Sequence, residues 1–247
     1  MMKARFEADG DVIVITGGAN GIGRALAGAA ARAGARVVIC DVDETAMAQA
    51  ESANALIAAR RLDVSDRDAA MTTFDAIQRE YGRIDGLVCA AAIQPRRLVH
   101  ETSPEEWRRV MSINLDGVVW CYQAVINGMI ARRRGSIIAF SSGLAHQGWP
   151  HASAYAATKG ALIAFVKSAA KEVAQHRVKV NLIAPGVIDT PQYRAANQGA
   201  DHERWKNSIG VGAPEDAVGP LMFLLSDAAT MTASVISRDF AYPAEDA

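Results

Sequence analysis

Short apolar segments alternate along the chain with longer segments of helical periodicity. The apolar segments do not alternate strictly between apolar and polar positions, so we expect helices to cover both faces of the sheet that they form. The predicted strands are residues 12–16, 36–40, 57–62, 84–89, 136–140 and 178–183. The predicted helices are residues 21–33, 43–53, 66–81, 104–131, 152–175 and 214–226, with Pro104 and Pro214 in first turns and Asp66 as a possible cap.

The repeated alternation of strand and helix predicts the fold class. Consecutive strand–helix–strand units give parallel strands with right-handed crossovers. We therefore expect a single α/β domain over residues 1–247, Rossmann-like, with a doubly wound parallel sheet and helices on both faces. Residues 187–212 have mixed polarity and three glycines, and they are predicted to form a mobile substrate loop or a small helical lid.

Composition narrows the class of protein. Half of the 247 residues are hydrophobic and 21% are charged, which is typical of a globular protein. The net charge of −1 argues against nucleic acid or an anionic membrane as the main partner. The first ten residues lack the apolar region of a signal peptide, and no segment approaches the ~20 apolar residues that span a bilayer, so we expect a cytoplasmic protein.

Cysteines and histidines give little sign of a disulfide or a metal site. Cys40, Cys89 and Cys121 are odd in number, lie in apolar surroundings and lack C-x-x-C spacing, so we expect reduced, buried thiols. His146 and His151 are close together, but the sequence places no third ligand beside them. No metal is expected.

A glycine-rich turn, TGGANGIG at residues 16–23, follows the first predicted strand and opens the first helix. Glycine lets the backbone turn tightly and approach a pyrophosphate, which the N–H groups and the dipole of the helix N-terminus stabilise. Glycines also serve ordinary tight turns, but a position between strand and helix favours a nucleotide site. The expected cofactor-binding residues of this turn are Gly17, Asn20, Gly21, Ile22 and Gly23.

Asp41 stands at the end of the second predicted strand, where an acidic side chain can accept hydrogen bonds from both hydroxyls of an adenosine ribose. The same carboxylate would repel a 2′-phosphate, and Asn20 and Val42 bring no cation to bind one. NAD is therefore favoured over NADP. The alternative is a strand-end turn or a helix cap shared with Asp43.

Tyr155 and Lys159 are four residues apart in a helical pattern, which places them on one face of the helix. An ammonium beside a phenol favours the phenolate, so we expect a lowered pKa for Tyr155 and a role in acid/base chemistry. Such a pair alone is weak evidence. Ser142 follows the fifth predicted strand, at the sheet edge where α/β proteins bind ligands, and it is suited to bind a substrate oxygen; otherwise it is an ordinary turn serine.

Together with further motifs, these features resemble the short-chain dehydrogenase/reductase family over residues 10–226. Each motif is modest, but their order and spacing along the chain are specific. The matching features are TGGANGIG at 16–23, Asp63-Val64, Asn114 in NLDG, Ser142, Tyr155-Ala-Ala-Thr-Lys159, and Asn181, Pro185-Gly186 and Thr190 in NLIAPGVIDT.

The resemblance implies a role for each matching residue. Tyr155 exchanges a proton with the substrate oxygen while hydride passes to or from the nicotinamide, Lys159 holds the nicotinamide ribose, and Ser142 fixes the reacting oxygen. Asn114 disturbs the ladder of its helix and holds a water that links Lys159 to solvent. The further expected cofactor contacts are Asp63 and Val64 at the adenine, Ile188 and Thr190 at the carboxamide, and Ala90, Pro185 and Gly186 along the cofactor.

Two segments depart from the family pattern. The family usually has Asn-Asn-Ala-Gly after the fourth strand, whereas this chain has Cys-Ala-Ala-Ala at residues 89–92. The family also tends to end with a Thr-Gly and a Val-Asp-Gly-Gly segment, whereas here Thr232-Ala233 leads into SVISRDFAYPAEDA. Support of the central sheet and placement of the last strand are therefore open at this stage.

The leading functional prediction is an NAD-dependent oxidoreductase that interconverts a secondary alcohol and a ketone. The alternative is a catalytically silent dinucleotide-binding protein on the same fold. Such a protein does not need a proton relay, so the joint presence of Asn114, Ser142, Tyr155 and Lys159 favours the enzyme. Polyols, cyclic alcohols and hydroxy acids all suit the segments expected at the mouth of the pocket, which contain Gln94, Arg96, His146, Gln147, Trp149, Gln192 and Tyr193.

The helices predicted at 104–131 and 152–175 are apolar over more than one face, and the family resemblance implies that they pair across a two-fold axis. We therefore expect a homo-oligomer, with a tetramer as the favoured state. The alternative is that the Ala-rich faces are good helix formers that remain exposed to water.

Overall fold

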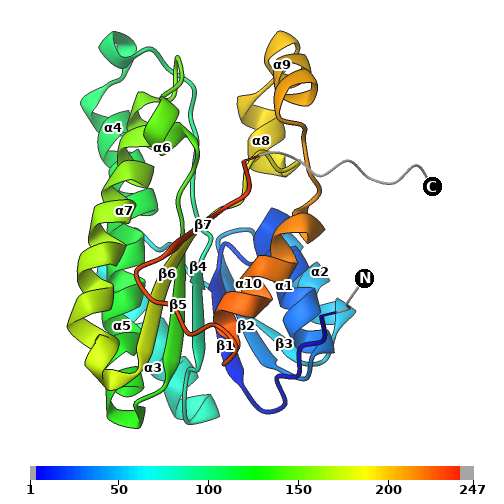
Figure 1. The fold of residues 1–247 in the computed structure, drawn as a ribbon, viewed down its shortest axis with the longest axis vertical. Helices are drawn as coiled ribbons and strands as arrows, with labels where there is room; N and C mark the ends of the chain where they lie inside the picture. The colour runs from blue at the N-terminus through cyan, green and yellow to red at the C-terminus, as the bar shows by residue number, and fades with distance from the viewer. Residues whose placement is uncertain (1–3, 240–247) are drawn as a thin grey trace.

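A computed structural model describes residues 4–239 (Figure 1). Within these residues, seven parallel strands form one sheet in the order β3-β2-β1-β4-β5-β6-β7. The chain builds β1, β2 and β3 outward in one direction and then returns to place β4 on the other side of β1. This is the predicted doubly wound topology, and a ligand crevice is expected where the direction reverses, between β1 and β4.

The strands agree with the predicted apolar segments to within two residues at each end. Their bounds are β1 Val12–Thr16, β2 Arg36–Asp41, β3 Ile57–Arg61, β4 Gly86–Cys89, β5 Gly135–Phe140, β6 Val178–Ala184 and β7 Val235–Ser237. The sequence did not predict β7. This strand has only three residues and none of them is fully buried, so it carries no run of apolar positions to signal it.

The helices also follow the pattern of the sequence. Their bounds are α1 Gly21–Arg32, α2 Glu44–Ala53, α3 Arg67–Tyr81, α4 Pro104–Met111, α5 Gly117–Arg132, α6 Leu144–Gln147, α7 Ser153–Val173, α8 Pro191–Ala196, α9 Ala200–Ser208 and α10 Val218–Leu225. Asp66 caps α3 by accepting a hydrogen bond from the Ala69 N–H at 2.9 Å, as expected. Pro104 lies in the first turn of α4, and Pro214 begins the short 3₁₀ helix Pro214–Ala217 that leads into α10.

The helix predicted over residues 104–131 is not continuous. A π-helical turn, Ser112–Asp116, separates α4 from α5. The side chain of Asn114, at the centre of this turn, is fully buried and hydrogen-bonds the backbone of Ile93. An amide that binds a neighbouring segment suits a wider turn than an α-helix provides, and hydrophobic periodicity does not reveal such a turn.

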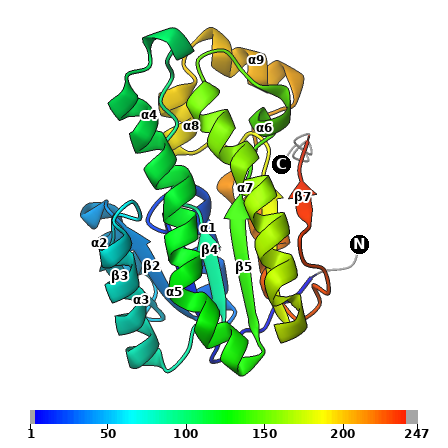
Figure 2. The same cartoon turned by 90° about the vertical axis from the view of Figure 1, so that its left-hand side faces the viewer.

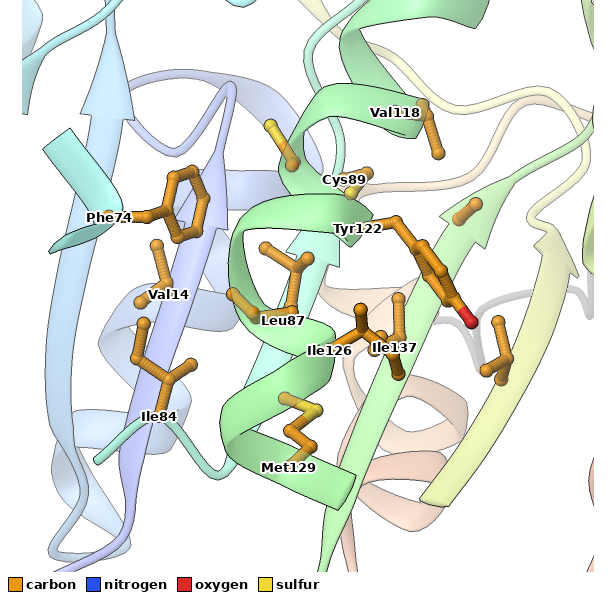
Figure 3. Close-up of a cluster of buried hydrophobic side chains, with 14 of the residues drawn as sticks. Val14, Phe74, Ile84, Leu87, Cys89, Val118, Tyr122, Ile126, Met129 and Ile137 are labelled. Atoms are coloured by element: carbon orange, nitrogen blue, oxygen red, sulfur yellow. The ribbon is translucent and has the colours of Figure 1, made fainter. Parts of the chain in front are cut away.

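Two helical layers cover the sheet (Figure 1). Helices α3, α5 and α7 bury side chains such as Phe74, Met129 and Leu162 against one face. Helices α1, α2 and α10 cover the other face with side chains that include Leu26 and Leu221. Figure 3 shows α5 lying across the strands, with its apolar side chains directed at the sheet. Each fully buried side chain of this size contributes about 2 kcal/mol to folding.

Helices α6, α8 and α9 lie beyond the carboxyl ends of the strands, at the same end of the molecule (Figures 1 and 2). Residues 187–212, predicted as a loop or lid, contain α8 and α9 and so form a small helical segment above the sheet edge. Among the residues that the structure describes, no helix is both long and apolar enough to cross a membrane.

Candidate active site

A cavity of about 590 Å³ opens at the carboxyl ends of the central strands. Its walls combine the glycine-rich turn, the ends of β2, β4, β5 and β6, helix α7 and the α8–α9 segment. Of the predicted catalytic and cofactor-binding residues, only Asn114 does not line it. The predicted residues that do are Gly17, Asn20, Gly21, Ile22, Gly23, Asp41, Asp63, Val64, Ala90, Ser142, Tyr155, Lys159, Pro185, Gly186, Ile188 and Thr190.

The glycine-rich turn leaves a cradle that side chains would fill. Gly17 has a φ of +66°, and a Cβ added there would lie 2.5 Å from the backbone nitrogen of Ala91. A Cβ at Gly21, with a φ of +51°, would lie 2.9 Å from the methyl group of Thr190. No side chain caps the N-terminus of α1, and no acidic residue lies in its first turn. The cradle therefore fits a dinucleotide pyrophosphate.

Asp41 is held in place by backbone hydrogen bonds. Its carboxylate accepts the N–H groups of Ala19 at 3.0 Å, Val42 at 2.8 Å and Asp43 at 3.2 Å. The alternative role, a helix cap, belongs to Asp43, which accepts the Ala46 N–H at the start of α2. Asp41 thus joins the glycine-rich turn to the end of β2 and places a negative charge on the cavity wall.

Asp63 and Val64 line the cavity just after β3. The Asp63 carboxylate accepts hydrogen bonds from the Ser65 hydroxyl at 2.7 Å and the Ser65 N–H at 3.0 Å. These bonds, the hydroxyl first, hold the pKa of Asp63 below its usual value. The carboxylate therefore stabilises its own turn, close to the strand-end role considered from the sequence, and it also faces the cavity.

Ser142, Tyr155 and Lys159 meet at the centre of the cavity. Ser142 follows β5, and its hydroxyl accepts the Leu144 N–H at 3.2 Å and hydrogen-bonds Tyr155. Tyr155 and Lys159 lie one turn apart on α7, with the Lys159 Nζ 5.5 Å from the centroid of the Tyr155 ring. The i,i+4 spacing and the apolar face of α7 against the sheet direct both side chains to this point.

Burial dominates the protonation of this pair. It raises the pKa of Tyr155 to about 12, against a smaller lowering by the Ser142 hydrogen bond. It also lowers the pKa of Lys159, which is only 3% exposed, to about 8. The sequence prediction that Lys159 lowers the Tyr155 pKa is therefore wrong for the chain on its own, because the loss of hydration favours the neutral form of each group.

Asn114 lies behind the cavity wall and is fully buried. Its Oδ1 accepts the Ile93 N–H and its Nδ2 donates to the Ile93 carbonyl, both at 2.9 Å, and Nδ2 also lies 3.4 Å from the Thr158 hydroxyl. Asn114 therefore fixes the segment after β4 against α7, next to Lys159. The predicted water relay through Asn114 stays a prediction.

Residues 185–190 connect β6 to α8 along the cavity. Gly186 has a φ of +76°, and the backbone of Arg238 packs directly against it. The Thr190 hydroxyl accepts the Tyr193 N–H at 3.1 Å and so caps α8. Ile188 forms a parallel bridge with Gly212, so the two ends of the α8–α9 segment are joined at its base.

The segments predicted at the mouth of the pocket are only partly on its wall. Gln94, Arg96, Gln147, Gln192 and Tyr193 line the cavity, whereas His146 and Trp149 do not. Residues that the sequence did not single out also line it. Among them are Leu144 of α6, Asn197, Trp205 and Ile209 of the 187–212 segment, Arg109 and Ile113 from the α4–α5 region, and Ser237, Arg238 and Asp239 from the C-terminal segment.

The two departures from the family pattern have structural counterparts. Cys89, where the family usually has asparagine, is buried and hydrogen-bonds Cys121; this bond and burial raise the pKa of the Cys121 thiol well above its usual value. Cys40, Cys89 and Cys121 are all free and buried, as expected. The C-terminal departure contributes β7 and the cavity residues 237–239, while residues 240–247 lie outside the described part of the chain. Within that part, no cluster of three potential metal ligands occurs.

Comparison with known proteins shows the family of this chain. A family model described as short chain dehydrogenase matches residues 11–201. A 3-oxoacyl-(acyl-carrier-protein) reductase of Thermotoga maritima is 35% identical over 239 residues, which cover 94% of this chain and 97% of that protein. A cis-4-hydroxycyclohexanecarboxylate dehydrogenase of Sinomonas cyclohexanicum is also 35% identical, over 94% of this chain and 96% of its own.

A solved structure, an NAD+-bound xylitol dehydrogenase, superposes with a TM-score of 0.86 at 26% identity and covers 93% of this chain and 98% of its own. The chain therefore belongs to the short-chain dehydrogenase/reductase family of oxidoreductases. This confirms the family resemblance and the fold class that the sequence predicted.

Proposed function

We propose that the protein is an NAD-dependent oxidoreductase that interconverts a secondary alcohol and a ketone, with Tyr155 as the acid/base. The observation that carries the proposal is that Ser142, Tyr155 and Lys159 line the same cavity as the glycine-rich turn and Asp41. A proton-transfer group and a dinucleotide cradle in one cavity are what hydride transfer at a carbinol carbon requires.

Each residue of the centre has a distinct role in this proposal. Ser142 binds the reacting oxygen, and Tyr155 takes its proton during oxidation or returns it during reduction. Lys159 binds the nicotinamide ribose. A bound oxidised nicotinamide supplies the hydride acceptor and a positive charge, which favours the Tyr155 phenolate. Asn114 keeps the β4–α4 segment in register with α7 and holds the proposed water that links Lys159 to solvent.

The preference for NAD over NADP rests on Asp41. Its carboxylate is fixed by three backbone N–H groups and cannot turn away from the cavity without breaking them. A 2′-phosphate at this position would meet a fixed negative charge, whereas ribose hydroxyls would meet an acceptor. The NAD+-bound xylitol dehydrogenase gives a related structure with this cofactor.

In the proposed arrangement a single domain binds both the cofactor and the substrate. Asp63 and Val64 contact the adenine, Ala90, Pro185 and Gly186 lie along the cofactor, and Ile188 and Thr190 contact the carboxamide. The segment 187–212 serves as the lid over the substrate end of the cavity.

A homotetramer formed through α5 and α7 also belongs to the proposal. Ala157, Ala164 and Ser168 form an exposed row of small residues on α7, beside the half-buried Phe165. Small residues permit close helix approach, and an apolar face of this kind is normally covered by a partner. Light scattering on a gel-filtration peak should give about four times the 26.2 kDa of one chain; a monomer mass at micromolar concentration contradicts the interface.

The proposed activity is tested with a panel of secondary alcohols and ketones, assayed by NADH absorbance with the purified protein. The expected result is turnover of at least one member of the panel with NAD+ or NADH, and loss of that turnover in Tyr155→Phe. No turnover on any member, together with tight NAD+ binding, would instead identify a silent dinucleotide-binding protein.

A further inference from the structure

An aromatic contact attaches the α8–α9 segment to the loop between α6 and α7. Trp149, in the loop between α6 and α7, packs on Trp205 of α9 with ring centroids 4.5 Å apart and ring planes 34° apart. The guanidinium carbon of Arg204 lies 4.5 Å from the centroid of the Trp149 ring. Trp149 thus contacts two consecutive side chains of α9. We call Trp149, Arg204 and Trp205 the clasp.

We call the α8–α9 segment the lid. The polar atoms of its aromatic side chains Trp205 and Tyr193 form hydrogen bonds to other residues of the lid. The Trp205 Nε1 donates to the Asn197 Oδ1 at 3.2 Å, and the Asn197 Nδ2 donates to the Tyr193 carbonyl at 3.0 Å. The Tyr193 hydroxyl lies 3.1 Å from the His202 Nδ1. Trp205 and Tyr193 are only 9% and 8% exposed, yet both line the cavity. Their rings therefore offer the cavity mainly carbon.

Apolar side chains continue this surface at the substrate end. Leu144 and Ile209 also line the cavity, and so does Val187, next to the Ile188–Gly212 bridge at the base of the lid. Among the polar lining residues, Gln94, Arg96 and Gln147 come from the segment after β4 and from α6, whereas Gln192 and Asn197 belong to the lid. The Asn197 amide is engaged by Trp205 and by the Tyr193 carbonyl. Trp205, Ile209 and Val187 thus give the lid an apolar surface, which we call the apolar wall.

We propose that Trp149 and Arg204 hold Trp205 in position as an apolar wall over the substrate, so that the site favours secondary alcohols whose carbinol carbon is flanked by hydrocarbon over polyols. The inference rests on the proposed oxidoreductase function. A polyol has hydroxyls next to the reacting carbon, and against this wall they lose hydrogen bonds to water without gaining a partner. A hydrocarbon ring or chain loses nothing of this kind and gains contact with Trp205.

The attachment is tested without any substrate. Trypsin cleaves after Arg194, Arg204 and Lys206, all within α8 and α9. Trp149→Ala should raise the rate of cleavage at these sites at least tenfold, whereas Trp149→Phe, which keeps a flat ring, should stay near wild type. Arg67→Ala is the matched control, because it also removes a guanidinium that lies over a tryptophan ring. The guanidinium carbon of Arg67 lies 5.6 Å from the centroid of the Trp120 ring, and this pair is not part of the lid. An unchanged cleavage rate in Trp149→Ala would overturn the clasp.

The apolar wall is tested with two probes, cyclohexanol and D-sorbitol, in the presence of saturating NAD+. Wild type should favour cyclohexanol at least tenfold in kcat/KM. Trp149→Ala should reduce this ratio through a higher KM for cyclohexanol, with the Kd for NAD+ unchanged. If Trp149→Ala does not fold, Arg204→Ala takes its place in this comparison, with Arg67→Ala again as the control.

The outcomes separate the inference from the proposed function. Equal or better use of D-sorbitol by wild type would overturn the apolar wall while supporting an oxidoreductase. Absence of turnover on the whole panel of alcohols and ketones would overturn the proposed function and the substrate preference together, and the trypsin result would still decide whether the clasp exists.

Discussion

The two ends of the cavity are built in different ways. The proposed cofactor end consists of the turn at residues 16–23, Asp41 and Asp63, each at or just after the end of a strand of the same parallel sheet. The substrate end consists of the segment after β4, the α6 region and the α8–α9 lid, which are far apart in the sequence. Backbone hydrogen bonds at the sheet edge fix the first end. The second end has a backbone bridge only at the base of the lid, between Ile188 and Gly212, and side-chain contacts such as Trp149–Trp205 join its other parts.

This difference indicates which end of the cavity a few substitutions can change. Strand ends cannot move without disturbing the sheet, so the residues placed there have little freedom. A lid attached by Trp149 and Trp205 can change with a few substitutions. The relatives differ in the substrates that their names give: one is a cis-4-hydroxycyclohexanecarboxylate dehydrogenase and another a 3-oxoacyl-(acyl-carrier-protein) reductase.

Tyr155→Phe is expected to have the largest effect. It deletes the hydroxyl that transfers the proton and should lower kcat on the order of a thousandfold, while the Kd for NAD+ stays within a factor of two. Steady-state kinetics and a fluorescence titration measure the two quantities. Wild-type kcat in Tyr155→Phe would remove Tyr155 from the chemistry.

Gly17→Ala probes how rigid the cofactor end is. A methyl group at Gly17 would lie 2.5 Å from the Ala91 nitrogen in addition to the strain of its positive φ. Gly10→Ala is the matched control, since Gly10 has a φ of +77° and nothing within 4 Å of its Cβ. We expect a loss of about 1 kcal/mol in the free energy of unfolding for Gly10→Ala and several-fold more for Gly17→Ala. Equal losses in a urea titration would mean that the close approach is not rigid.

Lys159→Met tests the cost of a buried ammonium. The Lys159 pKa falls from its usual 10.5 to about 8 in the folded chain, so between these pH values the unfolded chain holds a proton that the folded chain has lost. The contribution of Lys159 to wild-type stability should therefore rise with pH across this window. Without the lysine, the variant should show no such rise and should be about 3 kcal/mol more stable at pH 7. Thermal unfolding from pH 7 to 10, without cofactor, measures how the stability of each protein changes with pH. An equal change in wild type and variant would contradict the lowered pKa of Lys159.

Asp41→Asn has the smallest expected effect. Asparagine keeps an acceptor for the Ala19 N–H but removes the charge, so NADP affinity should improve several-fold and NAD affinity should weaken slightly. Fluorescence titrations with each cofactor compare the two. A wild-type protein that binds both cofactors equally would remove Asp41 as the basis of the preference.

The contrast between the two ends of the cavity also explains which features the sequence could predict. Strand ends, glycine-rich turns and the i,i+4 pair Tyr155–Lys159 are local patterns, and the structure brings them into one cavity. The π-helical turn at Asn114 depends on hydrogen bonds to Ile93, 21 residues away, and periodicity does not record it. Trp205 lines the cavity because Trp149 and Asn197 hold it there, and no local signal distinguishes it from any other partly apolar lid residue.

The protonation of Tyr155 and Lys159 shows another limit of sequence reasoning. Spacing alone indicates that Lys159 lies near Tyr155, and this predicts a lowered phenol pKa. The degree of burial decides the outcome, and it raises the pKa of Tyr155 to about 12 instead. Burial at a sheet edge under a lid is a property of the whole fold, so it becomes known only with the structure.

The central claim is that Tyr155 removes the hydroxyl proton of an alcohol while hydride passes from the carbinol carbon of the same molecule to the nicotinamide. The most direct test uses an alcohol that the panel identifies as substrate, carrying deuterium at the carbinol carbon, and mass spectrometry of the NADH formed. The proposal predicts one deuterium per NADH with the wild-type protein and almost no NADH with Tyr155→Phe. Unlabelled NADH, or labelled NADH formed equally fast by both proteins, would contradict it.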